Sequence, residues 1–446
     1  MASIPDIEPA PSRLPGWSAR VSERLGIGTD TLLDYAKLLT GQVGRLVFSL
    51  AYFLMLANAL SLSAFGVFAT ASAVGVVLSR VAAFGFVSPL YRTACVRPRL
   101  VGSFSLGYLA ALTASLPLVA LLGLAIHALV FADAISLGAF ALIVVAEVVL
   151  WRTAEVIVVV NNGLHRFARA SAAVIANTAV RSLAALLFML AATDGRGTLE
   201  DWALWYAGAN ALTLLGTCLF LQPHARLRWK PAIWLARWRD ALGVAGAEVL
   251  FYLQSEMDKV VVLAFGGPVT AGLYAIVMRL ADLTAIPLRS MMTLLIQRIM
   301  KDRGLGRTWM VWAGLEGAIA LVSILGMGAL ALLLNLMPEA LGENVATAAP
   351  FVLLVLAAPA FRNLVEFHTE ILYAFERTGE RLVQLAMVMG AKIALLIALL
   401  SMAAGFGTVA LWLNGVFAIL WLVSAAFTYN RLASAGFRTP QHGGRG

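Results

Sequence analysis

The sequence is poor in charge, cysteine and histidine. Only 13% of its 446 residues are charged and 61% are hydrophobic, whereas soluble domains carry about 25% charged residues. Two cysteines, Cys95 and Cys218, build no disulfide framework, and the five histidines form no HExxH-like cluster, so we expect no metal or cofactor. Residues 1–32 lack an apolar run and a cleavage site, which predicts no signal peptide. These shortages exclude an ordinary soluble domain and indicate a polytopic membrane protein.

Long apolar stretches dominate what remains. A membrane-spanning helix needs about 20 mostly apolar residues. The sequence therefore predicts an all-α polytopic membrane protein with about 12 transmembrane helices. The twelve stretches that qualify are 40–59, 66–88, 103–130, 138–160, 171–193, 202–221, 242–265, 271–298, 310–336, 347–375, 381–403 and 407–429.

The connections between these stretches alternate in charge. Arg196 is the one basic residue in one set of loops, whereas the other set is basic throughout. The basic segments are 91–99, 165–171, 224–240, 300–307 and 376–381. Because basic loops stay in the cytoplasm, we expect both termini there, as an even number of spans requires. The formal charge of +9 is then explained by the basic cytoplasmic loops, and we expect no nucleic-acid partner.

The longest basic loop divides the chain into two halves of six helices each. The expected units are a cytoplasmic N-terminal segment 1–39, a first lobe 40–221, a basic linker 222–241, a second lobe 242–429 and a cytoplasmic tail 430–446. Within residues 13–25, apolar positions fall on one helical face, which fits either an interfacial amphipathic helix or a disordered tail. Pro231 could start a short helix in the linker.

The two halves resemble each other where their second helix begins. Gly66, Phe68 and Ala69 align with Gly272, Tyr274 and Ala275 at one constant offset in "SLSAFGVFATA" and "PVTAGLYAIVM". With six helices in each half, such a repeat would be parallel and related by an axis along the membrane normal.

Charges inside the spans are costly and must be paired, wet or bound to a ligand. The first six spans hold Arg45, Arg80, Arg152 and Arg181 against Glu147 and Glu155. Arginine stays charged and offers bidentate donors to phosphate, so this excess favours an anionic ligand. We expect Arg45, Arg80, Arg181 and, from the second half, Arg279 to bind it.

The second half is richer in acidic residues, and helical spacing predicts some of their pairs. Glu256 and Lys259 lie three apart, as do Arg152 and Glu155 in the first half. Two further groups each share one helical face: Arg279, Asp282 and Arg289, and Arg362, Glu366 and Glu370. Asp258 has no partner at helical spacing within its own span. We therefore expect its carboxylate to contact either Arg279 on the next helix or water. The alternative role for any of these residues is an internal ion pair that holds helices together.

Two stretches carry a resemblance to a known family. "TGQVGRLVFSLAYFLMLANALSLSAFGVFATASAVGVVLSRVAAFGF" and "DKVVVLAFGGPVTAGLYAIVMRLADLTAIP" resemble the polysaccharide flippases of the multidrug/oligosaccharidyl-lipid/polysaccharide exporter superfamily. Lys259 replaces the commoner arginine of the family pattern. The likeness covers about residues 33–430, and twelve spans fit the O-antigen and exopolysaccharide branch.

The resemblance implies two lobes around a central cavity and a transporter rather than an enzyme. Such proteins move polyprenyl-diphosphate-linked oligosaccharides across the bacterial inner membrane by alternating access. The Arg set would then bind the diphosphate, and a polysaccharide polymerase or glycosyltransferases would be protein partners. Coupling to an ion gradient, or a cavity charge network, would involve Glu256, Asp258, Lys259, Asp282, Arg362, Glu366 and Glu370. The alternatives are a multidrug or cation antiporter of the same superfamily and an integral-membrane transferase.

Overall fold

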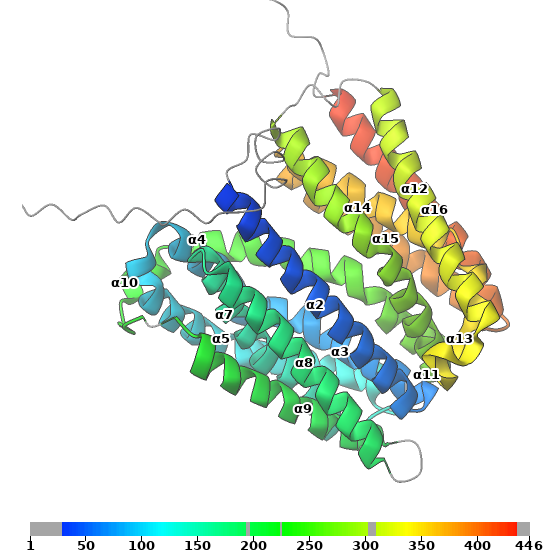
Figure 1. Ribbon diagram of the computed structural model, residues 1–446, viewed down its shortest axis with the longest axis horizontal. Helices are drawn as coiled ribbons and strands as arrows, with labels where there is room; N and C mark the ends of the chain where they lie inside the picture. Colours follow the sequence, from blue (N-terminus) through cyan, green and yellow to red (C-terminus); the bar gives the residue numbers. More distant parts are fainter. Residues whose placement is uncertain (1–28, 193–196, 224, 302–308, 435–446) are drawn as a thin grey trace, which may run out of the picture.

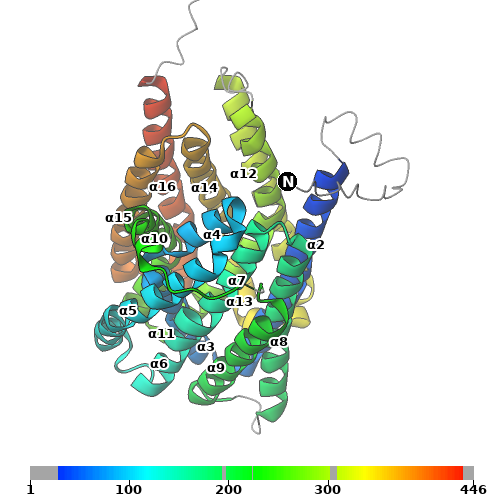
Figure 2. The same ribbon diagram turned by 90° about the vertical axis from the view of Figure 1, so that its left-hand side faces the viewer.

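The computed structural model describes residues 29–192, 197–223, 225–301 and 309–434. Nearly all of them are helical, and the chain is a multi-pass membrane protein. In Figure 1, α4 to α10 lie on one side of the bundle and α12 to α16 on the other. The start of α2 and the end of α16 lie at the same end of the bundle, here named the termini end (Figures 1 and 2).

The first half is built from long helices and from shorter helical segments that extend or connect them. They are α2 (Thr29–Ala59), α3 (Leu62–Val81) with η1 (Ala82–Gly85), α4 (Val87–Val96), η2 (Pro98–Leu100), α5 (Val101–Ile126) with η3 (His127–Phe131), α6 (Leu137–Val145), η4 (Ala146–Trp151), α7 (Arg152–Gly163), α8 (Phe167–Ala191) and α9 (Leu199–Gly216) with η5 (Thr217–Leu221). The predicted fourth span is thus interrupted by η4, a π-helical segment that contains Glu147. Such wide turns inside helices are frequent at functional sites.

The second half follows a short linker helix. Its elements are α10 (Pro231–Leu235), α11 (Trp238–Lys301), α12 (Trp309–Leu336), η6 (Pro338–Leu341), α13 (Glu343–Leu354), α14 (Ala358–Ala374), α15 (Thr378–Met402) and α16 (Phe406–Ser434). The short helix expected at Pro231 is confirmed. The helix considered for residues 13–25 lies outside the described residues.

The predicted spans coincide with these helices, but several differ in shape. In the second span, α3 ends at η1, where Ala83 and Phe84 are non-helical, and the fourth span is interrupted by η4. Spans seven and eight are joined in α11, where Gly267 alone is non-helical, with φ of +80°. The tenth span is two helices, α13 and α14, bent by 74°. Asn414 of α16 caps the bend: its amide donates to the Leu354 carbonyl (2.6 Å), and its oxygen accepts from the Ala357 and Ala358 amides (3.0 Å each). The freed backbone groups are therefore satisfied inside the membrane.

Length and apolarity alone identify fewer crossing segments than the twelve predicted spans. Within the described parts of the chain, eight segments pass this test, and α13 with α14 would be a ninth. The difference arises because α11 contains two predicted spans, α6 and α7 are split by η4, and the apolar part of α2, Gly44–Ala59, is short.

The aligned glycines of the two halves meet each other at the end opposite the termini. A Cβ on Gly66 would strike the backbone of Gly272 and Pro268, and one on Gly272 would strike the Leu62 carbonyl. Nearby, the Asn344 amide donates to the Ala57 and Leu60 carbonyls at 2.5 and 2.8 Å. The halves are therefore closed against each other at this end.

Gly66→Ala tests this closure. The added methyl group must push α3 away from α11, and we expect a loss of about 1–3 kcal/mol of unfolding free energy, as overpacking typically causes. The measurement is thermal unfolding of the purified protein in detergent. Gly314→Ala in α12 is the control, because its Cβ would meet nothing within 4 Å. Equal melting temperatures for both variants would contradict the close contact.

Candidate functional site

A cavity of about 550 Å³ lies within the first half and reaches α11 of the second. Arg45, Ser49, Tyr52 and Leu56 of α2 line it at spacings of three or four residues and so share one helical face, and the neighbouring Phe53 lines it too. Arg45 is exposed, whereas Leu56 is buried near the closed end. The cavity is therefore accessible from the termini end and closed at the other.

All four arginines predicted to bind an anion line this one cavity. They come from α2 (Arg45), α3 (Arg80), α8 (Arg181) and α11 (Arg279). Among its described lining residues, Glu155 is the acidic side chain, so the lining carries three positive charges in excess. Aromatic rings fill much of the remaining wall: Tyr52, Phe53, Phe65, Phe68, Trp151, Tyr206 and Tyr252.

Arg181 is held by its surroundings. Its guanidinium lies 3.5 Å from the centre of the Trp151 ring. It donates from Nε and Nη2 to the Asn210 oxygen at 2.9 and 2.6 Å, and its Nη2 lies 3.6 Å from Glu147 Oε2. The buried Glu147 also accepts from the Tyr206 hydroxyl. Arg181 is thus partly neutralised before any ligand arrives.

Arg80 belongs to a chain of ion pairs between the halves. It contacts Glu155 at 3.1 Å and lies 4.1 Å from the centre of the Tyr252 ring of α11. Glu155 also pairs with Arg152 at 2.7 Å, which confirms the predicted spacing, and Arg152 reaches Glu248 of α11 at 3.1 Å. These contacts connect α3 and α7 to the start of α11.

Arg45 and Arg279 differ from the other two arginines. Within the described part of the chain, neither has a carboxylate within ion-pair distance. Arg279 donates to the Ser49 hydroxyl of α2, which joins the halves. The cavity therefore presents two arginines that are ready for an external anion.

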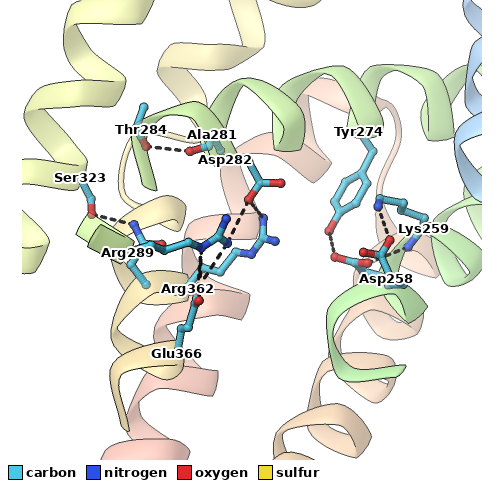
Figure 3. A network of polar contacts seen from close by, with 12 residues as sticks. Asp258, Lys259, Tyr274, Ala281, Asp282, Thr284, Arg289, Ser323, Arg362 and Glu366 are labelled. Carbon is cyan, nitrogen blue, oxygen red and sulfur yellow. Dashed lines mark hydrogen bonds and ion pairs between the residues drawn. The ribbon is translucent and has the colours of Figure 1, made fainter. Parts of the chain in front are cut away.

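The charged residues of the second half form a network of their own (Figure 3). Arg362 contacts Asp282 at 3.1 Å, and Arg289 contacts Glu366 at 3.2 Å and Asp282 at 3.7 Å. Arg289, Arg362 and Glu366 also line a small cavity of about 70 Å³. The predicted pairing of Asp282 with Arg289 is thus present, whereas Arg279 of the same stripe turns to Ser49 instead.

Asp258 finds partners that sequence spacing did not indicate. Its carboxylate accepts from the Tyr274 hydroxyl at 2.8 Å and lies 3.6 Å from Lys392 Nζ of α15. Lys392 also donates to the Gln254 carbonyl. The suggestion of Arg279 as its partner is therefore wrong, because α15 inserts a lysine that only tertiary packing brings near.

The remaining predicted charges are paired as well. Glu256 contacts Lys259 one turn away, as expected. Glu370 contacts Arg381 of α15 at 2.9 Å, rather than staying with Arg362 on its own helix. The carboxylates considered for ion coupling are thus each engaged by a cation, and a role in coupling stays a prediction.

The sequence prediction missed several residues that shape the first cavity. Asn210 and Asn177, inside apolar spans, hold Arg181 and Thr217. A polar amide in a span was an available signal, since such groups usually bond to another helix. The stacking of Trp151 on Arg181 had no signal, because it requires the end of η4 to lie beside α8.

No protein-family model and no curated protein matches the sequence. Solved structures do resemble the fold. A multidrug resistance MATE family transporter of the MOP superfamily, inward-facing, has a TM-score of 0.61 at 13% identity over 89% of this chain and 96% of that one. The lipid II flippase MurJ, inward closed, has a TM-score of 0.59 at 12% identity, over 90% and 87%. An outward-facing MATE transporter gives 0.55 at 14% identity, over 91% and 95%.

Proposed function

We propose that this chain, which has the fold of the MATE transporters and of the flippase MurJ, is itself a flippase. Its substrate would be a polyprenyl-diphosphate-linked oligosaccharide, moved across a bacterial inner membrane for surface polysaccharide synthesis. The observation that carries the proposal is the cationic cavity, where Arg45 and Arg279 have no carboxylate partner among the described residues.

Each part of such a lipid has a counterpart in the cavity. The diphosphate is rejected by hydrocarbon but can bind guanidinium groups by charge-assisted hydrogen bonds. Sugars can pack their apolar faces on the aromatic rings, find donors in the amides of Asn162 and Asn177, and find an acceptor in the Thr178 hydroxyl. The polyprenyl tail is apolar and stays in the bilayer.

The closed end and the accessible end suggest one state of an alternating-access cycle. The halves touch at Gly66 and Gly272, away from the termini, while the cavity is accessible from the termini end. The higher TM-score with the inward-facing than with the outward-facing MATE transporter supports the same interpretation. With the basic loops in the cytoplasm, the cavity would load its substrate from the cytoplasmic leaflet.

A multidrug or cation antiporter is the second candidate, favoured by the likeness to MATE transporters. The two candidates differ in the sign of the charge that the cavity must accept. A cationic drug would be repelled by the three excess positive charges of the lining.

Deletion of the gene in its own host separates the candidates. A flippase deletion is expected to accumulate polyprenyl-linked glycan on the cytoplasmic side and to lose surface polysaccharide, without changed drug susceptibility. Complementation with the wild-type gene should reverse both effects. Increased susceptibility to cationic drugs, with normal polysaccharide, would overturn the flippase assignment.

A further inference from the structure

A second polar cluster lies in the second half, apart from both cavities. His368 of α14 is fully buried, and its Nε2 lies 2.8 Å from Glu316 Oε1 of α12. The Tyr429 hydroxyl of α16 donates to the same carboxylate oxygen, and the Tyr429 ring lies edge-on to His368 at 5.5 Å. Three helices thus converge on one imidazole–carboxylate pair.

The other ring nitrogen of His368 belongs to a chain of hydrogen bonds in which donor and acceptor can exchange roles. Nδ1 lies 3.1 Å from the Ser424 hydroxyl, which accepts from the Gln384 amide at 2.6 Å. A hydroxyl can donate or accept, so it suits either protonation state of the imidazole. Gln384 is fully buried, and its Oε1 has no hydrogen-bond partner among the described residues. When Nδ1 becomes a donor, the Ser424 hydroxyl must accept from it and donate elsewhere. A rotation of the Gln384 side-chain amide by half a turn would place Oε1 to accept from that hydroxyl.

The charged groups around Glu316 pair with other residues, and His368 is the basic side chain that contacts it. Within the described part of the chain, no arginine or lysine pairs with Glu316. Glu366 is engaged by Arg289 and Glu370 by Arg381. Of the other charged groups on the packed helices, Arg362 pairs with Asp282 and Lys392 with Asp258. Arg377, at the start of α15, pairs with Glu380 and donates to the Arg431 carbonyl of α16. A buried carboxylate without a cation is costly, and a protonated imidazole would supply one.

We propose that His368 and Glu316 form a proton-binding site in the second half. Uptake of one proton on Nδ1 converts the pair from a single negative charge to a neutral ion pair, with Ser424 and Gln384 reversing their hydrogen bonds. Because α12, α14, α15 and α16 all contribute, the proton changes how these helices are tied together. Its use to drive the movement of the halves rests on the proposed function.

The position of the cluster gives the proton a route. His368, Glu316 and Tyr429 all lie within about two turns of the ends of their helices at the termini end. The Glu316 side chain is 15% exposed, whereas His368 is not exposed at all. In this state the site exchanges protons with the same side from which the first cavity is accessible.

Proton release after a pH jump tests the site directly. Purified protein in nanodiscs is taken from pH 5 to pH 9 with a pH indicator dye. Wild type is expected to release one proton more per molecule than His368→Gln. His165→Gln, which removes an exposed histidine, calibrates the measurement, because the loss of a solvent-accessible imidazole should also lower the release by one proton. Equal release by His368→Gln and wild type would overturn the proposal.

Coupling needs a second readout on the same samples. Binding of undecaprenyl diphosphate to the wild type is expected to depend on pH, and this dependence is expected to disappear in His368→Gln with affinity at pH 9 kept within about threefold. Thermal unfolding confirms that the variant folds, and Glu316→Gln provides a second variant. A pH dependence that persists in both variants contradicts coupling through this site. Failure of the wild type to bind the probe at any pH contradicts the proposed function and leaves the proton measurement to decide the site.

Discussion

Replacing Arg45 and Arg279 together by alanine is expected to weaken binding of undecaprenyl diphosphate by about 100-fold. Each arginine would contribute at least one charge-assisted hydrogen bond to the phosphates, worth about 1.5–3 kcal/mol, and each 1.4 kcal/mol is a tenfold change in affinity. The protein itself should lose little stability, because neither arginine has a described carboxylate partner to leave behind.

The control for this variant is the removal of two arginines elsewhere. Arg99→Ala with Arg228→Ala, here called the loop variant, removes the same charge from two exposed positions in the segments that connect the long helices. It should leave the affinity within about threefold. Arg181→Ala should instead lower the melting temperature, since it would leave the buried Glu147 without its cation. Arg80→Ala should cost less stability, because Glu155 keeps its pair with Arg152. Equal losses of affinity in the cavity and loop variants would show that only net charge matters.

Replacing Asp258 by asparagine is expected to lower the unfolding free energy by about 3–5 kcal/mol. The change removes the carboxylate near the buried Lys392 ammonium and leaves an uncompensated charge inside the second half. Adding Lys392→Met should recover most of the loss, because it removes the uncompensated ammonium group. The amide oxygen introduced by Asp258→Asn would still accept from the Tyr274 hydroxyl. The measurement is thermal or denaturant unfolding in detergent.

Glu256→Gln provides the comparison. Its pair with Lys259 is partly exposed, at 20% and 28%, so the cost should stay below about 1 kcal/mol. If Asp258→Asn kept full stability but abolished transport, Asp258 would belong to the coupling machinery rather than to the scaffold.

Local patterns in the sequence predicted much of the helical framework. Apolar runs indicated the spans, and three-residue spacing indicated the pairs Glu256–Lys259 and Arg152–Glu155. These features depend on residues that are neighbours along one helix or on composition alone. The repeat at Gly66 and Gly272 was visible too, although not that the two glycines touch.

Contacts between helices could not be predicted in the same way. Asp258 faces Lys392, and Glu370 faces Arg381, because α15 packs against both α11 and α14, which no spacing reveals. Two of the four cavity arginines pair with described carboxylates and two do not. This difference depends on the positions of Glu147 and Glu155, which lie in the interrupted fourth span. His368 lies off the face of α14 that carries Arg362, Glu366 and Glu370, and its contact with Glu316 of α12 depends on how the helices pack.

The dependence of binding on the head group tests the central claim most directly. Undecaprenyl diphosphate, undecaprenol of the same length and a lipophilic phosphonium cation would be titrated separately into the purified wild-type protein in nanodiscs. A flippase with a cationic cavity should bind the diphosphate about 100-fold more tightly than the alcohol, and bind the cation most weakly. Equal affinity for the diphosphate and the alcohol, or tighter binding of the cation, would contradict it.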